Sequence, residues 1–174
     1  MTIQAVTAAH VDELATFFDM LSERDLTFIR EDLSDSAALA TRVADEMRWI
    51  DTDETGIRGY VAVERLTGWS NHVGELRLVV SPQRRGTGLG RALASYAVAA
   101  AVGLGIRKVV VELATDQEGA VAMFSRLGFT GEALLRDHIR DRDGNLHDLI
   151  VLAHDVGENW STIEGVGLAD ALAL

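Results

Sequence analysis

SPQRRGTGLGRAL, residues 81–93, is the stretch of this sequence that decides the fold. It follows an apolar run at 76–80 and precedes the alanine-rich segment 88–103, whose pattern predicts a helix. A strand, a glycine-rich turn and a helix N-terminus together form a site for an anion, because the first N–H groups of a helix have no partner inside it. Glycines let the backbone approach a phosphate closely, and here they are Gly86, Gly88 and Gly90. The stretch predicts a phosphate or pyrophosphate site, and an ordinary strand–helix turn with solvated arginines is the alternative.

The composition is that of one globular domain. The chain has 174 residues, of which 48% are hydrophobic and 25% charged, enough to bury a real core. The absence of cysteine excludes a disulfide framework, a thiolate nucleophile and a thiolate metal site. A net charge of −11 disfavours nucleic acid or an anionic membrane as partner. It would attract a cationic substrate, and the alternative is that the charge only keeps the protein soluble. The longest charge-free run, 92–106, is too short to span a bilayer, and no signal peptide is recognisable, so we expect a cytoplasmic protein.

Strand and helix patterns alternate along the chain. Seven segments have the pattern of strands: 3–6, 48–52, 58–66, 72–80, 108–113, 131–140 and 146–156. We expect helices after Thr7, near Ser36, over 88–103 and after a capping box at 115–118. We expect one domain over 1–156. The tail, 157–174, is at most a weak helix that could serve as a homodimer contact or cover a sheet edge.

Several turns have specific signatures. Gly128 stands where a helix ends in a left-handed residue, and Phe129 where an apolar contact follows that residue. Asp143-Gly144 predicts a two-residue hairpin between the last two strands. The unbroken apolar run 149–152 predicts a strand buried on both faces.

Two other phosphate-binding motifs compete for the glycine loop. A dinucleotide site needs G-x-G-x-x-G with an acid about 20 residues later. Glu112 could be that acid, but Arg91 stands where the third glycine belongs, and the chain after Glu112 is too short for a doubly wound sheet. A P-loop needs Gly-Lys-Ser/Thr, which the loop lacks.

Gln83-Arg84-Arg85-Gly86-Thr87-Gly88 resembles the Q/R-x-x-G-x-G/A signature of the GNAT N-acetyltransferases. The preceding LRLVVSP resembles the fourth strand of that family, and VVVELATDQEGAVAMFSRLGF, residues 109–129, resembles its fifth strand and following helix. The resemblance is most specific over 72–156. It implies an α/β fold of mixed α+β type, the GNAT acyl-CoA N-acyltransferase fold, with a central mixed sheet of about seven strands flanked by about four helices.

The resemblance also implies a function: transfer of the acetyl group of acetyl-CoA to a primary amine by direct attack in a ternary complex, without a metal. Loop N–H groups would hold the pyrophosphate. Strands four and five would splay apart, so that pantetheine pairs with the free edge of strand four. The implied cofactor-binding residues are Val79, Val80, Gln83, Arg84, Arg85, Gly86, Thr87, Gly88, Leu89, Gly90, Arg91 and Phe124.

Two glutamates are candidates for the general base. Glu112 occupies the strand-five position where the family often has a catalytic glutamate, and its apolar neighbours would form a cleft wall. An ordinary ion pair of Glu112 with an arginine is the alternative. Glu75 on strand four is the second candidate, and a salt bridge with Arg77 is the simpler interpretation.

The sequence departs from the family pattern at Phe124, where many relatives have a tyrosine that protonates the leaving thiolate. Water, Ser125 or Tyr96 would have to substitute, or turnover would be slow. A non-catalytic acyl-CoA-binding module is therefore one alternative function, and a dinucleotide-dependent enzyme is another.

The hairpin at 136–148 contains several possible metal ligands, but their spacing fits neither a calcium loop nor a zinc site. We expect Arg136, His138 and Arg140 to alternate onto one face beside the acceptor site. The acceptor remains open among a small molecule, a peptide N-terminus and a protein lysine.

Overall fold

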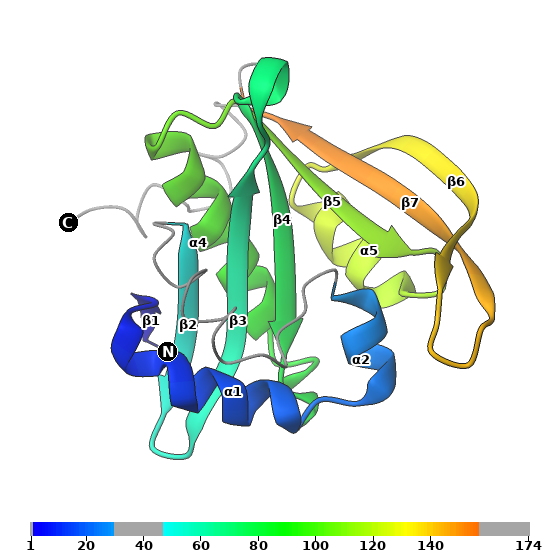
Figure 1. Cartoon of the computed structure of the whole chain (residues 1–174). Coiled ribbons are helices and arrows are strands. Elements are labelled where there is room, and N and C mark those ends of the chain that lie inside the picture. The colour runs from blue at the N-terminus through cyan, green and yellow to red at the C-terminus, as the bar shows by residue number, and fades with distance from the viewer. Residues whose placement is uncertain (1, 30–46, 157–174) are drawn as a thin grey trace.

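The computed structural model describes residues 2–29 and 47–156 and shows a seven-stranded mixed sheet (Figure 1). Its order is β1-β2-β3-β4-β5-β7-β6, and only β4 and β5 are parallel. The predicted mixed sheet is thus confirmed. The strands are β1 (Ile3–Ala5), β2 (Arg48–Asp53), β3 (Gly56–Arg65), β4 (Val73–Val80), β5 (Lys108–Ala114), β6 (Thr130–Arg140) and β7 (Leu146–Asp155).

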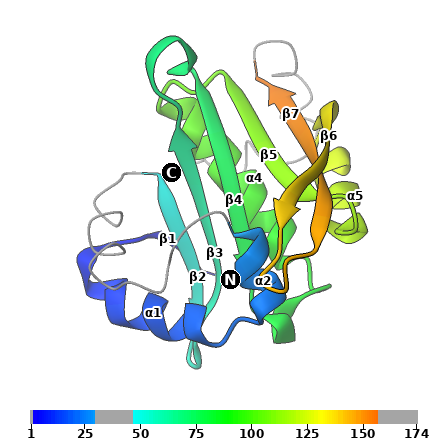
Figure 2. The ribbon, with the colours of Figure 1, turned by 45° about the vertical axis from the view of Figure 1, so that its right-hand side comes forward.

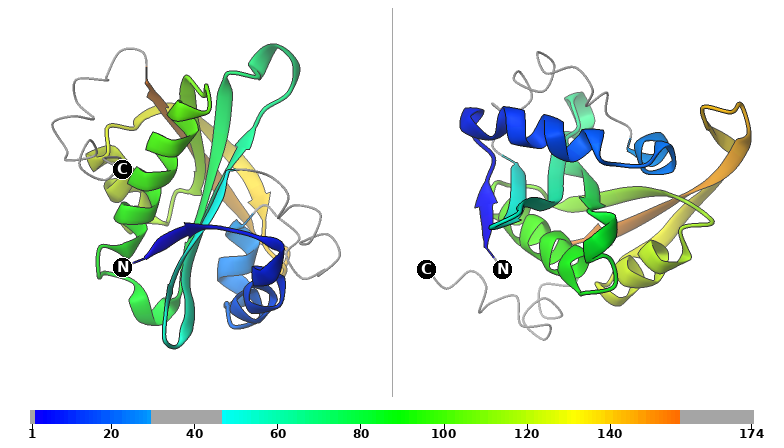
Figure 3. Two further views of the ribbon diagram at one scale, coloured as in Figure 1. Left: turned by 90° about the vertical axis from the view of Figure 1, so that its left-hand side faces the viewer. Right: turned by 90° about the horizontal axis from the view of Figure 1, so that it is seen from below.

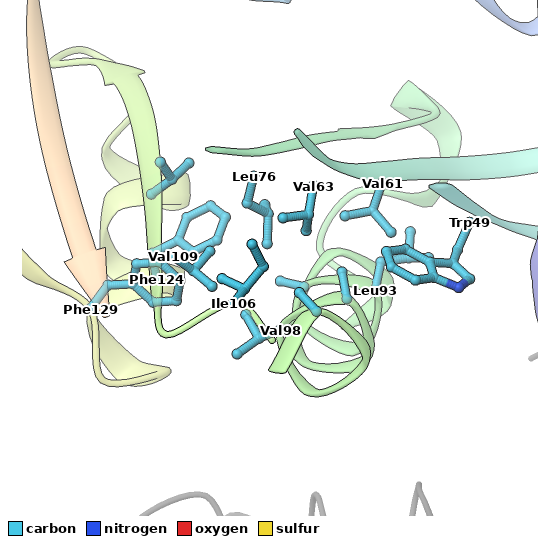
Figure 4. Packing of buried hydrophobic residues seen from close by; sticks show 14 of the residues in the cluster. Trp49, Val61, Val63, Leu76, Leu93, Val98, Ile106, Val109, Phe124 and Phe129 are labelled. Carbon is cyan, nitrogen blue, oxygen red and sulfur yellow. The ribbon is translucent and has the colours of Figure 1, made fainter. Parts of the chain in front are cut away.

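Helices cover both faces of the sheet. Seen from below in Figure 3, α1 (Val11–Asp19) and α2 (Glu23–Phe28) lie on one side, and α4 (Leu89–Gly103) and α5 (Glu118–Arg126) on the other. Each side has its own buried apolar cluster. The larger cluster joins α4 and α5 to the sheet through residues such as Trp49, Leu76, Leu93, Phe124 and Phe129 (Figure 4).

Helix α4 approaches the backbone of β3 closely at Gly59. Leu89 and Leu93 are buried as expected, but the rest of its inner face consists of small residues, and Tyr96 and Ala100 are only half-buried. A Cβ atom on Gly59 of β3 would stand 2.6 Å from the Cδ1 atom of Leu93. Small side chains on the helix and a glycine on the strand therefore allow the close approach.

Helix α5 ends as predicted but starts differently. Gly128 has φ +88°, the N–H of Phe129 donates to the Phe124 carbonyl at 3.1 Å, and the two rings lie 5.1 Å apart edge to face. The prediction of a capping box at 115–118 is wrong, because Gln117 is the N-cap and Glu118 is the first helical residue. The Gln117 side chain instead accepts a bond from the Ala114 N–H.

Other local expectations need correction. Thr7 precedes a short 3₁₀ turn at 8–10 rather than α1 itself. The last hairpin turns over five residues, 141–145, with Gly144 at φ +90°, instead of two. Within 149–152 the two outer residues, which lie on opposite faces, are buried and the two middle ones are half-buried, so both faces of this strand are covered in part.

Two predicted elements cannot be compared with the structure. The helix near Ser36 and the tail at 157–174 lie outside the described residues. Helix α2 was not predicted at all, although Ser22 and Asp25 form a capping box at its start.

Candidate functional site

Strands β4 and β5 splay apart, as the family resemblance implied. They pair over three residues only, from Val73 opposite Lys108 to Glu75 opposite Val110. Beyond that point β5 continues alongside β7 as far as Ala114, and it diverges from β4 (Figure 1). The backbone edge of β4 from residue 76 to 80 therefore has no strand partner on the β5 side.

A cavity of about 720 Å³ occupies the region between the diverging strands. Its walls come from residues 75–80 of β4, residues 111–114 of β5, and side chains of α2 and α5. Tyr60 of β3 and His138 of β6 complete the lining on the side of α2. The free edge of β4 is thus one wall of a cavity that opens to solvent.

The glycine loop lies at the C-terminal end of β4. Gly86 and Gly88 have φ values of +74° and +88°, which other residues rarely adopt, so the loop requires glycine at both positions. The first bond of α4 runs from the Ala92 N–H to the Gly88 carbonyl. Consequently the N–H groups of residues 89–91 have no partner inside the helix, and the predicted anion site has the expected backbone geometry.

Both arginines of the loop are held by acidic residues. Arg84 bonds Asp53 at 2.8 Å, and Arg85 bonds Asp25 at 2.6 Å while its Nε donates to the Val80 carbonyl at 3.3 Å. Hydrogen bonds from Thr55, with the nearby guanidinium groups, hold the pKa of Asp53 below its usual value. The arginine charge at the loop is therefore already partly compensated.

Two further side chains shape the loop. The Thr87 hydroxyl donates to the Arg84 carbonyl at 2.6 Å, and Gln83 accepts a bond from the Ser81 hydroxyl at 2.5 Å. Of the other predicted cofactor residues, Leu89 is buried and Arg91 is exposed, and neither lines the cavity. Only Val79, Val80, Arg85 and Phe124 of that predicted set do so.

The structure brings both candidate bases into the same cavity. Glu75 is 8% exposed, and its Oε1 accepts a bond from Arg77 Nε at 3.0 Å, the salt bridge weighed from the sequence. Glu112 is half-buried. Glu75 lies opposite Val110, two residues before Glu112, so both carboxylates share one face of the sheet. This is the face covered by α1 and α2.

Phe124 is fully buried and lines the cavity from α5, where relatives were expected to carry a tyrosine. Neither proposed substitute lines the cavity: Tyr96 packs against Trp49 with ring centroids 5.8 Å apart, and Ser125 is exposed. Sequence reasoning missed Tyr60, a lining phenol whose oxygen accepts a 2.5 Å bond from Arg48.

The expectation for the last hairpin is only partly met. A bulge between Leu135 and Ile139 interrupts the alternation of β6, and Asp137 there has φ +51°. Of the three basic residues expected on one face, His138 lines the cavity, but Arg136 and Arg140 do not. The N–H of Asp137 donates to Asp148, which holds the bulge in place.

Comparison with known proteins settles the family. The sequence model described as "Acetyltransferase (GNAT) family" matches residues 10–129, which include the glycine loop, both strands of the splay and α5. The chain belongs to the GNAT acetyltransferase family. As a GNAT protein it has one parallel strand pair, so the doubly wound sheet of a dinucleotide-binding enzyme is absent from the described residues.

Solved structures with low sequence identity share the GNAT fold. A ribosomal-protein-alanine N-acetyltransferase from Brucella melitensis has 18% identity and a TM-score of 0.79, over 89% of this chain and 99% of that one. A putative acetyltransferase from Salmonella typhimurium, solved with its cofactor acetyl-CoA, has 16% identity and a TM-score of 0.76, over 90% and 94%.

A phosphinothricin acetyltransferase from Sinorhizobium meliloti, in complex with acetyl-CoA, has 21% identity and a TM-score of 0.75, over 88% of this chain and 87% of that one. A search of curated protein sequences finds no match. In the described parts of this GNAT chain, no helix is both long and apolar enough to cross a membrane.

Proposed function

We propose that this GNAT protein is a cytoplasmic N-acetyltransferase that transfers the acetyl group of acetyl-CoA to a primary amine in a ternary complex. The observation that carries the proposal is the free edge of β4 leading from the glycine loop into a cavity with two carboxylates. Two of the acetyltransferases sharing the fold were solved with acetyl-CoA. The proposal requires no metal.

The residues fit the donor in two places. The left-handed glycines and the unpartnered N–H groups of residues 89–91 would hold the pyrophosphate, and the helix dipole favours negative charge there. The backbone groups of Val79 and Val80 would pair with the amides of pantetheine. The thioester would then lie in the cavity, between Phe124 on one side and the carboxylates on the other.

The chemistry needs one proton transfer before acyl transfer. Glu112, with Glu75 as the second candidate, accepts a proton from the ammonium group, directly or through a water molecule. The amine nitrogen then forms a bond to the thioester carbon, and the carbon–sulfur bond breaks. Since a thiol has a pKa of about 8.5, the thiolate can leave without a protein acid, although more slowly.

A non-catalytic acyl-CoA-binding module is the second candidate, and Phe124 is the observation that favours it. Calorimetry with acetyl-CoA and assays of thiol release across a panel of amines separate the two functions. Binding with amine-dependent thiol release supports the enzyme. Binding without release from any small amine, peptide N-terminus or lysine supports the module, and the absence of acetyl-CoA binding contradicts both.

A further inference from the structure

Three consecutive residues of α2 pair with three separate elements around the cavity. These elements are the hairpin after β6, the segment before α5 and the glycine loop, and α2 lies between them (Figure 2). The ion pairs are Glu23 with Arg142 at 2.6 Å, Arg24 with Asp116 at 2.7 Å, and Asp25 with Arg85 at 2.6 Å.

The Asp25–Arg85 pair is the most shielded of the three. The Asp25 side chain is 16% exposed, whereas every side chain of the other two pairs is at least 44% exposed. Exposed ion pairs contribute little to stability because water and salt screen them, and shielding increases the contribution. Asp25 is also held in place, because its Oδ2 accepts bonds from the N–H and hydroxyl of Ser22 while its Oδ1 faces Arg85.

Arg85 stands at the junction of the loop and the cavity. Its backbone precedes the two left-handed glycines, while its side chain reaches the Val80 carbonyl and Asp25 in the cavity wall. A guanidinium group binds phosphate as well as carboxylate, usually through two parallel bonds. A pyrophosphate on the loop would therefore present Arg85 with a second anion of higher charge.

We propose that Asp25 competes with the pyrophosphate of the donor for Arg85, so that donor binding releases α2 from the glycine loop. This inference rests on the proposed function, because it needs acetyl-CoA at the loop. Since Arg24 and Thr27 of α2 line the cavity, the release loosens the wall that α2 contributes to it. The two exposed ion pairs persist, so α2 loosens rather than detaches.

The first test measures affinity by calorimetry for Asp25→Asn and the wild type. Asparagine keeps the size of the side chain and one oxygen for the Ser22 N–H, but removes the charge that holds Arg85. Acetyl-CoA should bind the variant about three- to tenfold more tightly, the range expected for one partly shielded ion pair. S-acetylpantetheine, which carries no phosphate, should bind both proteins equally.

Glu23→Gln is the matched control, because it makes the same charge change on the same helix and breaks only the Arg142 pair. Its affinity for acetyl-CoA should equal that of the wild type. Weaker binding to Asp25→Asn would mean that Asp25 orients Arg85 for phosphate, and unchanged binding would mean no competition. Either result overturns the proposal while the wild type still binds acetyl-CoA. A wild type that does not bind overturns the proposed function as well.

The second test follows α2 directly. The amides of Leu26 and Ile29 donate to the carbonyls of Ser22 and Asp25, so their solvent exchange reports the integrity of the helix. Acetyl-CoA should accelerate this exchange in the wild type, and the Asp25→Asn variant should exchange rapidly without it. Slower exchange on adding acetyl-CoA would contradict the release of α2.

Discussion

At the scale of single residues, the cavity contains two carboxylates in different surroundings. Glu75 is nearly buried and already bonded to Arg77, whereas Glu112 is half-buried on the diverging strand. Glu75 lies within the paired segment of β4 and β5, whereas Glu112 lies beyond it, where the two strands have separated and the side chain is more exposed. This position favours Glu112 as the group that accepts the proton of the amine.

We expect Glu112→Gln to lower kcat about 100-fold with little change in the affinity for acetyl-CoA, because a general base contributes about that much. Steady-state kinetics and calorimetry measure the two quantities. Glu75→Gln is the comparison: an inactive Glu75→Gln beside an active Glu112→Gln would assign the base to β4.

Phe124→Tyr should raise kcat, because a phenol at this position can protonate the leaving thiolate. The gain should be about 10²-fold, the lower end of the 10²–10⁴-fold that proton transfer by a positioned side chain typically contributes. Phe129→Tyr is the control, since this buried ring packs edge to face against Phe124 but does not line the cavity. Equal rates for the wild type and Phe124→Tyr would show that thiolate departure does not limit turnover.

At the scale of elements, the turn between β4 and α4 requires glycine at positions 86 and 88, and the space around both is open. A Cβ atom on Gly88 would meet nothing within 4 Å, so a side chain there projects to where the pyrophosphate would bind. Gly88→Glu should weaken acetyl-CoA binding at least tenfold, or about 1.4 kcal/mol.

Gly105→Glu is the matched control, because Gly105 has the same φ of +88° and the same open surroundings at the other end of α4. Calorimetry should show normal binding for Gly105→Glu; equal losses in both variants would indicate backbone strain alone.

The turn of the last hairpin makes a prediction about pH. A hydrogen bond from His147 at 2.9 Å, with further bonds from Asn145, lowers the pKa of Asp141 to about 2. Because the folded pKa lies below the unfolded value of 3.8, this contribution to stability is complete above about pH 4 and disappears as the pH falls toward 2. An NMR titration of His147→Ala should give Asp141 a pKa nearer 3.8. His72→Ala, remote from the turn, should leave it near 2.

Local backbone requirements explain which elements the sequence analysis predicted correctly. The glycines at 86, 88 and 128 each adopt a left-handed conformation in a turn of only a few residues, so their roles are visible in the local sequence. Helix α2 has only six residues, and two of its ion pairs reach residues 60 and 92 positions away. Contacts of that range are not visible in a local pattern, and Tyr60 was missed for the same reason.

At the scale of the whole molecule, the two parts of the sheet meet at a short parallel junction. Gly74 lies in the middle of it, opposite Val109, and a Cβ atom there would stand 2.5 Å from the Cγ1 atom of Val63. Gly74→Ala should lower the free energy of unfolding by about 1–3 kcal/mol, the usual cost of overpacking. Denaturant unfolding measures the change. Gly103→Ala, in open space at the end of α4, should be neutral or stabilising; equal stability of the two variants would show that Val63 moves aside without cost.

Some features of the whole molecule can be predicted from local sequence patterns, and others cannot. Sequence patterns predicted the strands to within one or two residues, since alternation and turns are local, whereas the mixed sheet was implied by the family resemblance. That Glu75 and Glu112 share one cavity depends on the β4–β5 register, which joins segments across the whole of α4. The net charge of −11 does not show where the site lies, because the arginines of the glycine loop pair with carboxylates close by.

The short contact between β4 and β5 also has a consequence for how the sheet is held together. Strands β1 to β4 pair antiparallel in chain order, and β5, β7 and β6 form a second antiparallel group. The parallel ladder that joins the two groups has three residue pairs, whereas the neighbouring β3–β4 and β5–β7 ladders have seven each. A hinge between the two groups would therefore break fewer backbone bonds at this junction than a break within either neighbouring ladder, and the edge proposed to bind the donor lies next to that hinge.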